Sequence, residues 1–269
     1  MNAPAPNTER WFEQILDHFD GVDTRVWRQR YFVNASMYKP GGPVFLCVGG
    51  EGPALEPTVV VTGDEHCALM VLLASRHSAL VLALEHRFYG SSHPTNDLAT
   101  ENLRFLSSQQ ALADLAVFRM AVMAEHGLPT DTKWVTFGGS YPGMLAAWAR
   151  SKFPHLIHAS VSSSAPVQAV ANMQGYNDVT ADALADEAVG GSEKCVAAVR
   201  AAFADLGARL SLAEGRRQLE RDFNVCGGTG ALEPLQARAL FAEGAADPLV
   251  PQVPHSSPSA GPIGGQPLI

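Results

Sequence analysis

Short, continuous apolar runs punctuate the first 170 residues of this chain and predict buried strands. A strand covered on both faces has no polar side to show, so it reads as an unbroken apolar run. Residues 43–49 and 79–84 have this character. Residues 27–34 alternate and predict a partly exposed strand, and residues 156–164 predict another. The pattern therefore indicates a sheet with a well-covered centre.

Helical stretches alternate with these runs. Residues 64–75 predict one helix. A capping box at Ser107-Ser108-Gln109-Gln110 opens a long helix that runs through Glu125 and is closed by Gly127. Its apolar face is expected to pack on the sheet. That face comprises Leu112, Leu115, Phe118 and Val122. Alternating strands and helices predict the α/β class.

The character of the chain changes after Val170, where strand patterns stop. Residues 195–210 and 212–223 predict helices. From residue 244 onward there are six prolines, four glycines, no aromatic residue and no Lys or Arg. Such a segment has too little apolar surface to offset the entropy of ordering. We expect an α/β part over residues 1–170, a helical part over 171–243 and a disordered tail over 244–269.

Composition narrows the classes of partner. With 46% hydrophobic and 17% charged residues, the 269-residue chain suits a buried α/β core. The net charge of −8 argues against nucleic acid and anionic membranes, which select basic patches. No apolar run approaches the roughly 20 residues that cross a bilayer. The first ten residues lack the apolar segment of a signal peptide.

The stretch with the clearest chemistry is residues 134–145. A β-branched and aromatic run ends in Gly138-Gly139, Ser140 follows, and a helix is expected from Tyr141. A strand that turns sharply into a helix at a serine is a nucleophile elbow, in which strained backbone exposes the hydroxyl. Pro142 stands where the motif has its second glycine, and Gly143 comes one position later. The alternative is a Gly-Ser turn in an ordinary strand–helix unit.

Two further loops follow predicted strands. Gly49-Gly50-Glu51-Gly52 comes directly after a buried strand, where an α/β-hydrolase supplies one oxyanion-hole N–H. A plain strand-to-helix turn fits these glycines equally well. His86 lies in a polar-aromatic loop after the next strand. Because hydrolases of this fold place the catalytic His after the Ser in sequence, a structural hydrogen-bonding role is expected for His86.

Cysteine usage and one sequon bear on the cellular compartment. Cys47 and Cys67 read as buried apolar fillers, whereas Cys195 and Cys226 lie in more polar helical sequence and are candidates for disulfides. No spacing of His and Cys indicates zinc, and no cofactor is implied. Asn34-Ala35-Ser36 is a candidate glycosylation site if the protein enters the secretory pathway.

Several stretches together resemble one family, the serine carboxypeptidases that include lysosomal Pro-X carboxypeptidase and dipeptidyl peptidase II. The later motifs are most similar to thymus-specific serine protease. The matching stretches are residues 11–19, 29–31, 49–52, 84–90, 106–114, 138–141, 145–150, 153–157, 163–167 and 176–179. The resemblance runs from about Trp11 to Cys226 and is highly specific.

The resemblance implies the amino-terminal part of an α/β-hydrolase fold with a partial helical cap. It implies a secreted or lysosomal serine exopeptidase that acts on peptides. It makes Ser140 the nucleophile and the Tyr141 N–H an oxyanion donor, with Gly50 and Glu51 where a second donor is expected. Cys195 and Cys226 fall where the family has cap disulfides. A homodimer is left open.

The resemblance also places the family's catalytic Asp and His beyond the cap, past the matching part of this chain. Within the chain, Asp247 and His255 follow Ser140 in the required order, but they lie in the Pro/Gly-rich tail and read as solvent-exposed. His155 and His158 read as surface or edge residues. Two alternatives to a peptidase therefore remain: a non-catalytic fragment that binds peptides or partners, and a lipase or esterase on the same fold.

Overall fold

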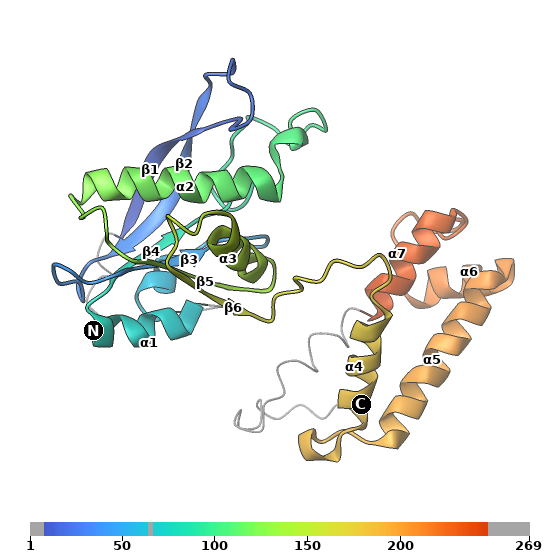
Figure 1. Cartoon of the computed structure of the whole chain (residues 1–269). Coiled ribbons are helices and arrows are strands. Elements are labelled where there is room, and N and C mark those ends of the chain that lie inside the picture. Colours follow the sequence, from blue (N-terminus) through green and yellow to red (C-terminus); the bar gives the residue numbers. More distant parts are fainter. Residues whose placement is uncertain (1–7, 64–66, 247–269) are drawn as a thin grey trace, which may run out of the picture. The chain divides into compact units, whose positions relative to one another are not determined.

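The computed structural model describes residues 8–63 and 67–246. The chain forms two compact units, Met1–Ala169 and Val170–Ile269 (Figure 1). The first unit contains a six-stranded sheet with helices on both faces, and the described part of the second unit is helical. The tail residues Asp247 and His255 lie outside the described residues, as do residues 64–66 of the first predicted helix.

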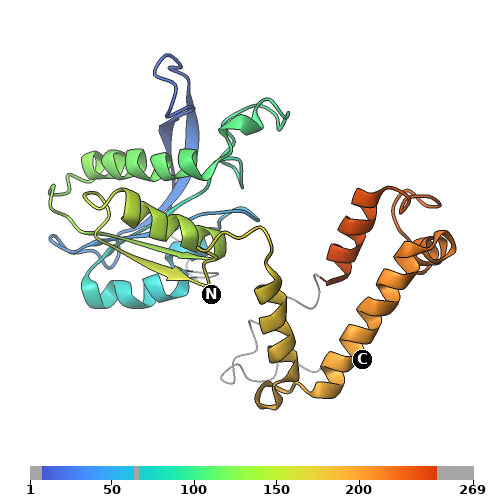
Figure 2. The ribbon, with the colours of Figure 1, turned by 45° about the vertical axis from the view of Figure 1, so that its right-hand side comes forward.

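The sheet is mixed, with strand order β1-β2-β4-β3-β5-β6 (Figures 1 and 2). β2 runs antiparallel to both β1 and β4, whereas β4, β3, β5 and β6 run parallel to one another. This arrangement is that of an α/β-hydrolase, as the sequence predicts. The strands are β1 (Glu9–Ile15), β2 (Val26–Asn34), β3 (Val44–Val48), β4 (Leu80–Leu84), β5 (Trp134–Gly139) and β6 (Ala159–Ser163).

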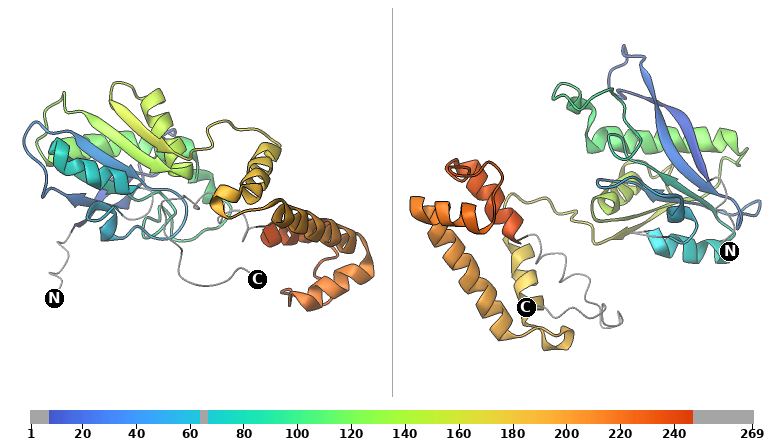
Figure 3. Two further views of the ribbon diagram at one scale, coloured as in Figure 1. Left: turned by 90° about the horizontal axis from the view of Figure 1, so that it is seen from below. Right: turned by 180° about the vertical axis from the view of Figure 1, so that it is seen from behind.

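The two central strands are apolar because both of their faces are covered. Every residue of β3 and β4 is buried. Alternate side chains of β3 face opposite ways, as the period of a strand requires. Val44, Leu46 and Val48 pack with α2 (Ser108–Glu125) and α3 (Ser140–Lys152). Phe45 and Cys47 pack with α1 (Ala68–His77) and the 3₁₀-helix η1 (Pro57–Val60). Figure 3 shows α1 and α2 on opposite faces of the sheet.

The long helix α2 begins where its capping box predicts. The Ser107 hydroxyl accepts a hydrogen bond from the Gln110 N–H at 3.2 Å, which satisfies one of the free donors of the first turn. The predicted apolar face is buried over its whole length, including Phe118 at 0% exposure. The ring of Phe118 contacts those of Tyr31 on β2 and Trp134 on β5. This face therefore holds α2 on the sheet.

The strand β1 carries no apolar alternation that would predict it. Its buried residue is Gln14, at 0% exposure. The Gln14 amide donates to the Gln29 side-chain oxygen at 3.0 Å and to the Asp114 carbonyl at 3.2 Å. A polar residue is tolerated inside because its hydrogen bonds are made.

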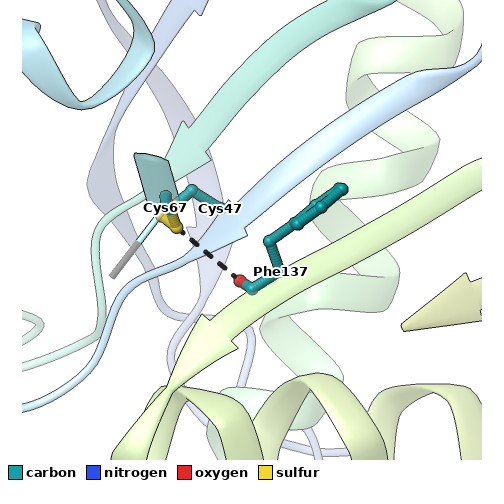
Figure 4. Close-up of a disulfide and its surroundings, with 3 residues drawn as sticks. All are labelled: Cys47, Cys67 and Phe137. Atoms are coloured by element: carbon teal, nitrogen blue, oxygen red, sulfur yellow. Dashed lines mark hydrogen bonds between the residues drawn. A yellow bond between two sulfur atoms is a disulfide. The ribbon is translucent and has the colours of Figure 1, made fainter. Parts of the chain in front are cut away.

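Cys47 and Cys67 are buried, as expected, but they are not free apolar fillers. Cys47 and Cys67 form a disulfide, with Cα atoms 5.9 Å apart (Figure 4). Cys47 on β3 and Cys67 before α1 belong to the same apolar cluster on one face of the sheet, which brings their side chains together. The Cys67 sulfur lies 3.9 Å from the carbonyl oxygen of Phe137 on β5. The bridge closes a loop that contains Gly49-Gly50-Glu51-Gly52.

Cys195 and Cys226, the predicted disulfide candidates, are free and exposed. Cys195 lies near the start of α5 (Glu193–Ser211), and Cys226 follows α6 (Ala213–Asp222). The two thiols thus belong to different helical segments of the second unit, and neither has a disulfide partner among the described residues.

The second unit also contains two helices that the sequence pattern did not predict, α4 (Gln174–Ala185) and α7 (Leu235–Ala246). The predicted helices α5 and α6 are both present. The Ser192 hydroxyl caps α5 by accepting from the Cys195 N–H at 3.1 Å. In the described residues, no helix is both long and apolar enough to span a bilayer.

Replacing Cys47 and Cys67 together by Ala is expected to lower the free energy of unfolding by about 3 kcal/mol, the value for a cross-linked loop of this length. Urea unfolding with and without reductant measures the loss. The matched control is the Cys195→Ser/Cys226→Ser pair, which should change stability by less than about 0.5 kcal/mol because both thiols are exposed. An unfolding midpoint of the wild type that reductant does not lower would contradict the bridge.

Candidate active site

Ser140 occupies the turn between β5 and α3. Its φ of +55° lies in the left-handed region, which few residues other than glycine adopt. The residue is exposed, whereas the two glycines before it are buried. Gly139 caps α3, so the helix begins at Ser140, one residue before the predicted start. Strained backbone and an exposed hydroxyl at this turn are the geometry of a nucleophile elbow.

Missing side chains at two positions make the turn possible. A Cβ on Gly138 would stand 2.3 Å from the Pro142 carbonyl oxygen. A Cβ on Gly143 would stand 3.0 Å from the Ala165 Cβ and from the Ser163 carbonyl oxygen at the end of β6. The backbone that approaches the end of β6 most closely is therefore that of Gly143, which lies one position after the usual second glycine of the motif. Pro142 is buried and fits the first turn of α3, where its missing N–H leaves no bond unmade.

The loop after β3 lies against the same turn. A Cβ on Gly50 would stand 2.3 Å from the Pro142 ring and 3.4 Å from the Tyr141 ring. Glu51 is exposed and close enough that its charge contributes to raising the Tyr141 pKa. The structure thus places the loop at Gly50 against the turn that carries Ser140 and Tyr141. The oxyanion role of these residues stays a prediction. Backbone N–H groups near a helix start are suited to bind a negatively charged oxygen.

His86 has the hydrogen-bonding role that was expected. Its Nδ1 lies 2.7 Å from the Arg87 carbonyl oxygen and its Nε2 lies 3.0 Å from the Tyr141 hydroxyl. Burial lowers the His86 pKa from its ordinary value of 6.5, so the ring is neutral. Burial, with the nearby Tyr89 and Glu51, raises the pKa of Tyr141 to about 12, so its hydroxyl keeps its proton.

A buried ion pair anchors the loop that carries His86. The Arg87 guanidinium is fully buried and binds both oxygens of Asp114 on α2 at 2.7 Å. It also donates to the carbonyl oxygens of Leu16 and Phe105 at 3.0 Å. Buried charges of this kind stabilise a fold only when their hydrogen bonds are satisfied, as here. The hydrophobic pattern of α2 did not mark Asp114 as buried, because a single acid on a helix is usually a surface residue.

A second ion pair holds the same loop from the side of β2. Arg30 on β2 donates to Glu85 oxygens at 2.7 and 3.2 Å. Glu85 also accepts from the Ser92 hydroxyl at 2.7 Å. Gly90 has φ +58°, and a Cβ there would overlap a Glu85 oxygen. Glu85 at the start of the loop is therefore tied to β2, and Ser92 further along the loop is tied to Glu85.

The other histidines weighed as bases lie elsewhere. His155 and His158 are exposed, as predicted. Among the residues that the structure describes, no side chain makes a hydrogen bond to the Ser140 hydroxyl, and no three His, Cys, Asp or Glu residues converge to hold a metal ion.

Comparison with known proteins decides the family. The model of the serine carboxypeptidase S28 family matches residues 14–249. The chain belongs to this family. The family is one of serine-type peptidases.

Thymus-specific serine protease of Homo sapiens is 48% identical over 225 residues, which cover 83% of this chain and 43% of that protein. Lysosomal Pro-X carboxypeptidase of Mus musculus is 34% identical over 165 residues, which cover 58% of this chain and 32% of that protein. A solved proline iminopeptidase from Mycobacterium smegmatis aligns over 83% of this chain and 66% of the iminopeptidase chain, with a TM-score of 0.45 and 18% sequence identity. The chain spans less than half the length of these two curated relatives.

Asn34 is expected to carry no glycan in the folded protein. Its side chain is buried, its amide nitrogen donates to the Val60 carbonyl at 2.8 Å, and its oxygen accepts from the Ser36 N–H at 3.0 Å. A sugar on that nitrogen would remove the bond and the burial. Enzymatic deglycosylation of protein secreted from eukaryotic cells should leave its mass unchanged. A mass decrease that is absent in the Ser36→Ala variant would contradict this expectation.

Stability is expected to fall as the pH drops below about 6.5. The unfolded chain binds a proton at His86 near pH 6.5, whereas the folded chain resists it because burial lowers the pKa. The His86 contribution is therefore complete above pH 6.5 and is lost towards the folded pKa, at up to about 1.4 kcal/mol per pH unit. Urea unfolding between pH 7 and 5 should show a shallower loss for His86→Gln. The exposed His155→Gln is the control, and equal slopes for all three proteins would refute the assignment.

Proposed function

We propose that Ser140 is the nucleophile of a serine exopeptidase of the Pro-X carboxypeptidase or dipeptidyl-peptidase type. The observation that carries the proposal is the left-handed, exposed serine at the strand-to-helix turn of an S28 family chain. The names of the relatives support a peptide substrate, since they include a Pro-X carboxypeptidase. Peptides are then the partners of this site.

In the proposed reaction, the Ser140 Oγ attacks the carbonyl carbon of the scissile peptide bond while its proton passes to a histidine base. The resulting oxyanion is held by the Tyr141 N–H and by an N–H of Gly50 or Glu51. The C–N bond then breaks, and the leaving amine takes the proton back from the histidine. Water hydrolyses the acyl-enzyme by the same steps in reverse.

The base and its orienting carboxylate are proposed to be the Asp and His that the family carries after the cap. This assignment rests on the resemblance, and the matched region is only 43% and 32% of the length of the two relatives. A non-catalytic role, in which the chain binds peptides or a partner, is the competing proposal. It is favoured by the absence of a described hydrogen-bond partner for the Ser140 hydroxyl.

Residence in the secretory pathway, in lysosomes or outside the cell, is part of the same proposal. The Cys47–Cys67 disulfide supports it, because such bridges persist in oxidising compartments. The helical unit from Val170 is proposed to act as the cap that the resemblance implies.

A fluorophosphonate probe tests the nucleophile directly. A protein that includes the proposed Asp and His after the cap is expected to be labelled once, and Ser140→Ala is expected to abolish labelling. Ser164→Ala is a matched control, because Ser164 is also exposed, also left-handed at φ +46°, and follows the neighbouring strand β6. Mass spectrometry of the labelled peptide identifies the site.

Failure of a cooperatively folded wild type to react would support the non-catalytic role. For a labelled chain, peptides that carry proline near either terminus should be cleaved faster than simple esters. The reverse preference would favour an esterase.

A further inference from the structure

His86 connects the loop after β4 to the residue that follows the candidate nucleophile. The proposed reaction uses the peptide N–H of Tyr141 but leaves its side chain and His86 without a role. The imidazole is buried, at 4% exposure, and contacts the rings of both Tyr89 and Tyr141. The ring centroids are 5.4 Å and 5.5 Å from that of His86.

We propose that His86 is a positioning residue for the reaction at Ser140: it accepts the Tyr141 hydroxyl and so fixes the peptide N–H of Tyr141 and the left-handed backbone of Ser140. The inference rests on the proposed function, because it assigns His86 a part in the same site.

The partners of His86 determine which ring nitrogen carries the hydrogen. Nδ1 faces a carbonyl oxygen of Arg87, which can only accept, so Nδ1 must donate. The neutral ring then has an unprotonated Nε2, which accepts the Tyr141 hydroxyl at 3.0 Å. Both nitrogens are occupied, and the imidazole has no freedom to act as the base at Ser140.

The acceptor is itself held in place. The carbonyl that binds Nδ1 belongs to Arg87, whose guanidinium is fixed by Asp114 and by the Leu16 and Phe105 carbonyls. These contacts come from α2, from the residue after β1 and from the segment just before α2. Tyr141 lies in the first turn of α3, but its hydroxyl is thus fixed by a chain of hydrogen bonds through His86 and Arg87.

Positioning matters at this turn because its backbone is strained. Ser140 at φ +55° and Tyr141 are adjacent, so a rotation that relaxes one displaces the N–H of the other. A movement of the Tyr141 side chain would also move that peptide group, and the hydrogen bond from the Tyr141 hydroxyl to His86 prevents this movement. Displacements of about 1 Å at a reacting centre reduce rates by up to about a hundredfold.

The first experiment compares two variants that each remove one hydrogen-bonded tyrosine hydroxyl. Tyr141→Phe breaks the bond to His86. Tyr31→Phe breaks a similar bond, to the Glu125 carboxylate at 2.8 Å between β2 and α2, away from the elbow. The rate of fluorophosphonate labelling, per folded molecule from thermal unfolding, is expected to fall about tenfold in Tyr141→Phe. It is expected to stay at the wild-type rate in Tyr31→Phe.

Variants of His86 complete a cycle. His86→Leu is expected to match Tyr141→Phe, and the double variant to be no slower than either single one, because both remove one interaction. His86→Gln is expected to retain most of the rate, since its amide can donate to the Arg87 carbonyl and accept the hydroxyl. Equal labelling of Tyr141→Phe and wild type, or additive losses in the double variant, would overturn the proposal.

A spectroscopic readout separates this inference from the proposed function. In ¹⁵N NMR, His86 should show a protonated Nδ1 and an unprotonated Nε2 whose signal moves in Tyr141→Phe but not in Tyr31→Phe. If the folded wild type is not labelled at all, the proposed function fails for this chain, and the backbone amide signals of Ser140 and Tyr141 decide the inference. Their displacement in His86→Leu supports it, and their coincidence with wild type overturns it.

Discussion

Close backbone contact around Ser140 is the constraint on which the rest of the site depends. The left-handed turn can form only if three segments approach it without side chains, at Gly50, Gly138 and Gly143. Those segments come from the loop after β3, the end of β5 and the first turn of α3. A Cβ at Gly50 or Gly138 would meet an atom at 2.3 Å and push its segment away. The site is therefore shaped by backbone before any side chain contributes.

Around this turn, the loop after β4 supplies rigidity of a different kind. Two ion pairs, Arg87–Asp114 and Arg30–Glu85, tie that loop to α2 and to β2. Such pairs cost desolvation energy and add little net stability over an apolar core. Their effect is directional, since each guanidinium binds its carboxylate in a fixed geometry. The loop that carries His86 is thus held by directional ion pairs as well as by apolar packing.

The sequence revealed the features that leave a local mark. The apolar runs of β3 and β4 record burial on two faces, and the Ser107 cap marks the start of α2. Gly138-Gly139-Ser140 marks the turn itself. Features that depend on chain segments meeting in space left no such mark. The Cys47–Cys67 bridge and the Arg87–Asp114 pair join positions distant in sequence, and the role of Gly143 depends on the path of β6.

β6 is the last strand of the sheet in the described residues, and its outer edge has consequences for handling the protein. An edge strand offers free N–H and C=O groups that can pair with another chain. Here the strand sequence is Ala159-Ser160-Val161-Ser162-Ser163, with one β-branched apolar residue and three serines. Small hydroxyl side chains bury little apolar surface when two edges meet, and the Ser162 hydroxyl is already bonded to the Gly143 carbonyl at 2.8 Å. The edge is thus a weak template for intermolecular sheet growth, which favours a dispersed sample over fibrous precipitate during purification.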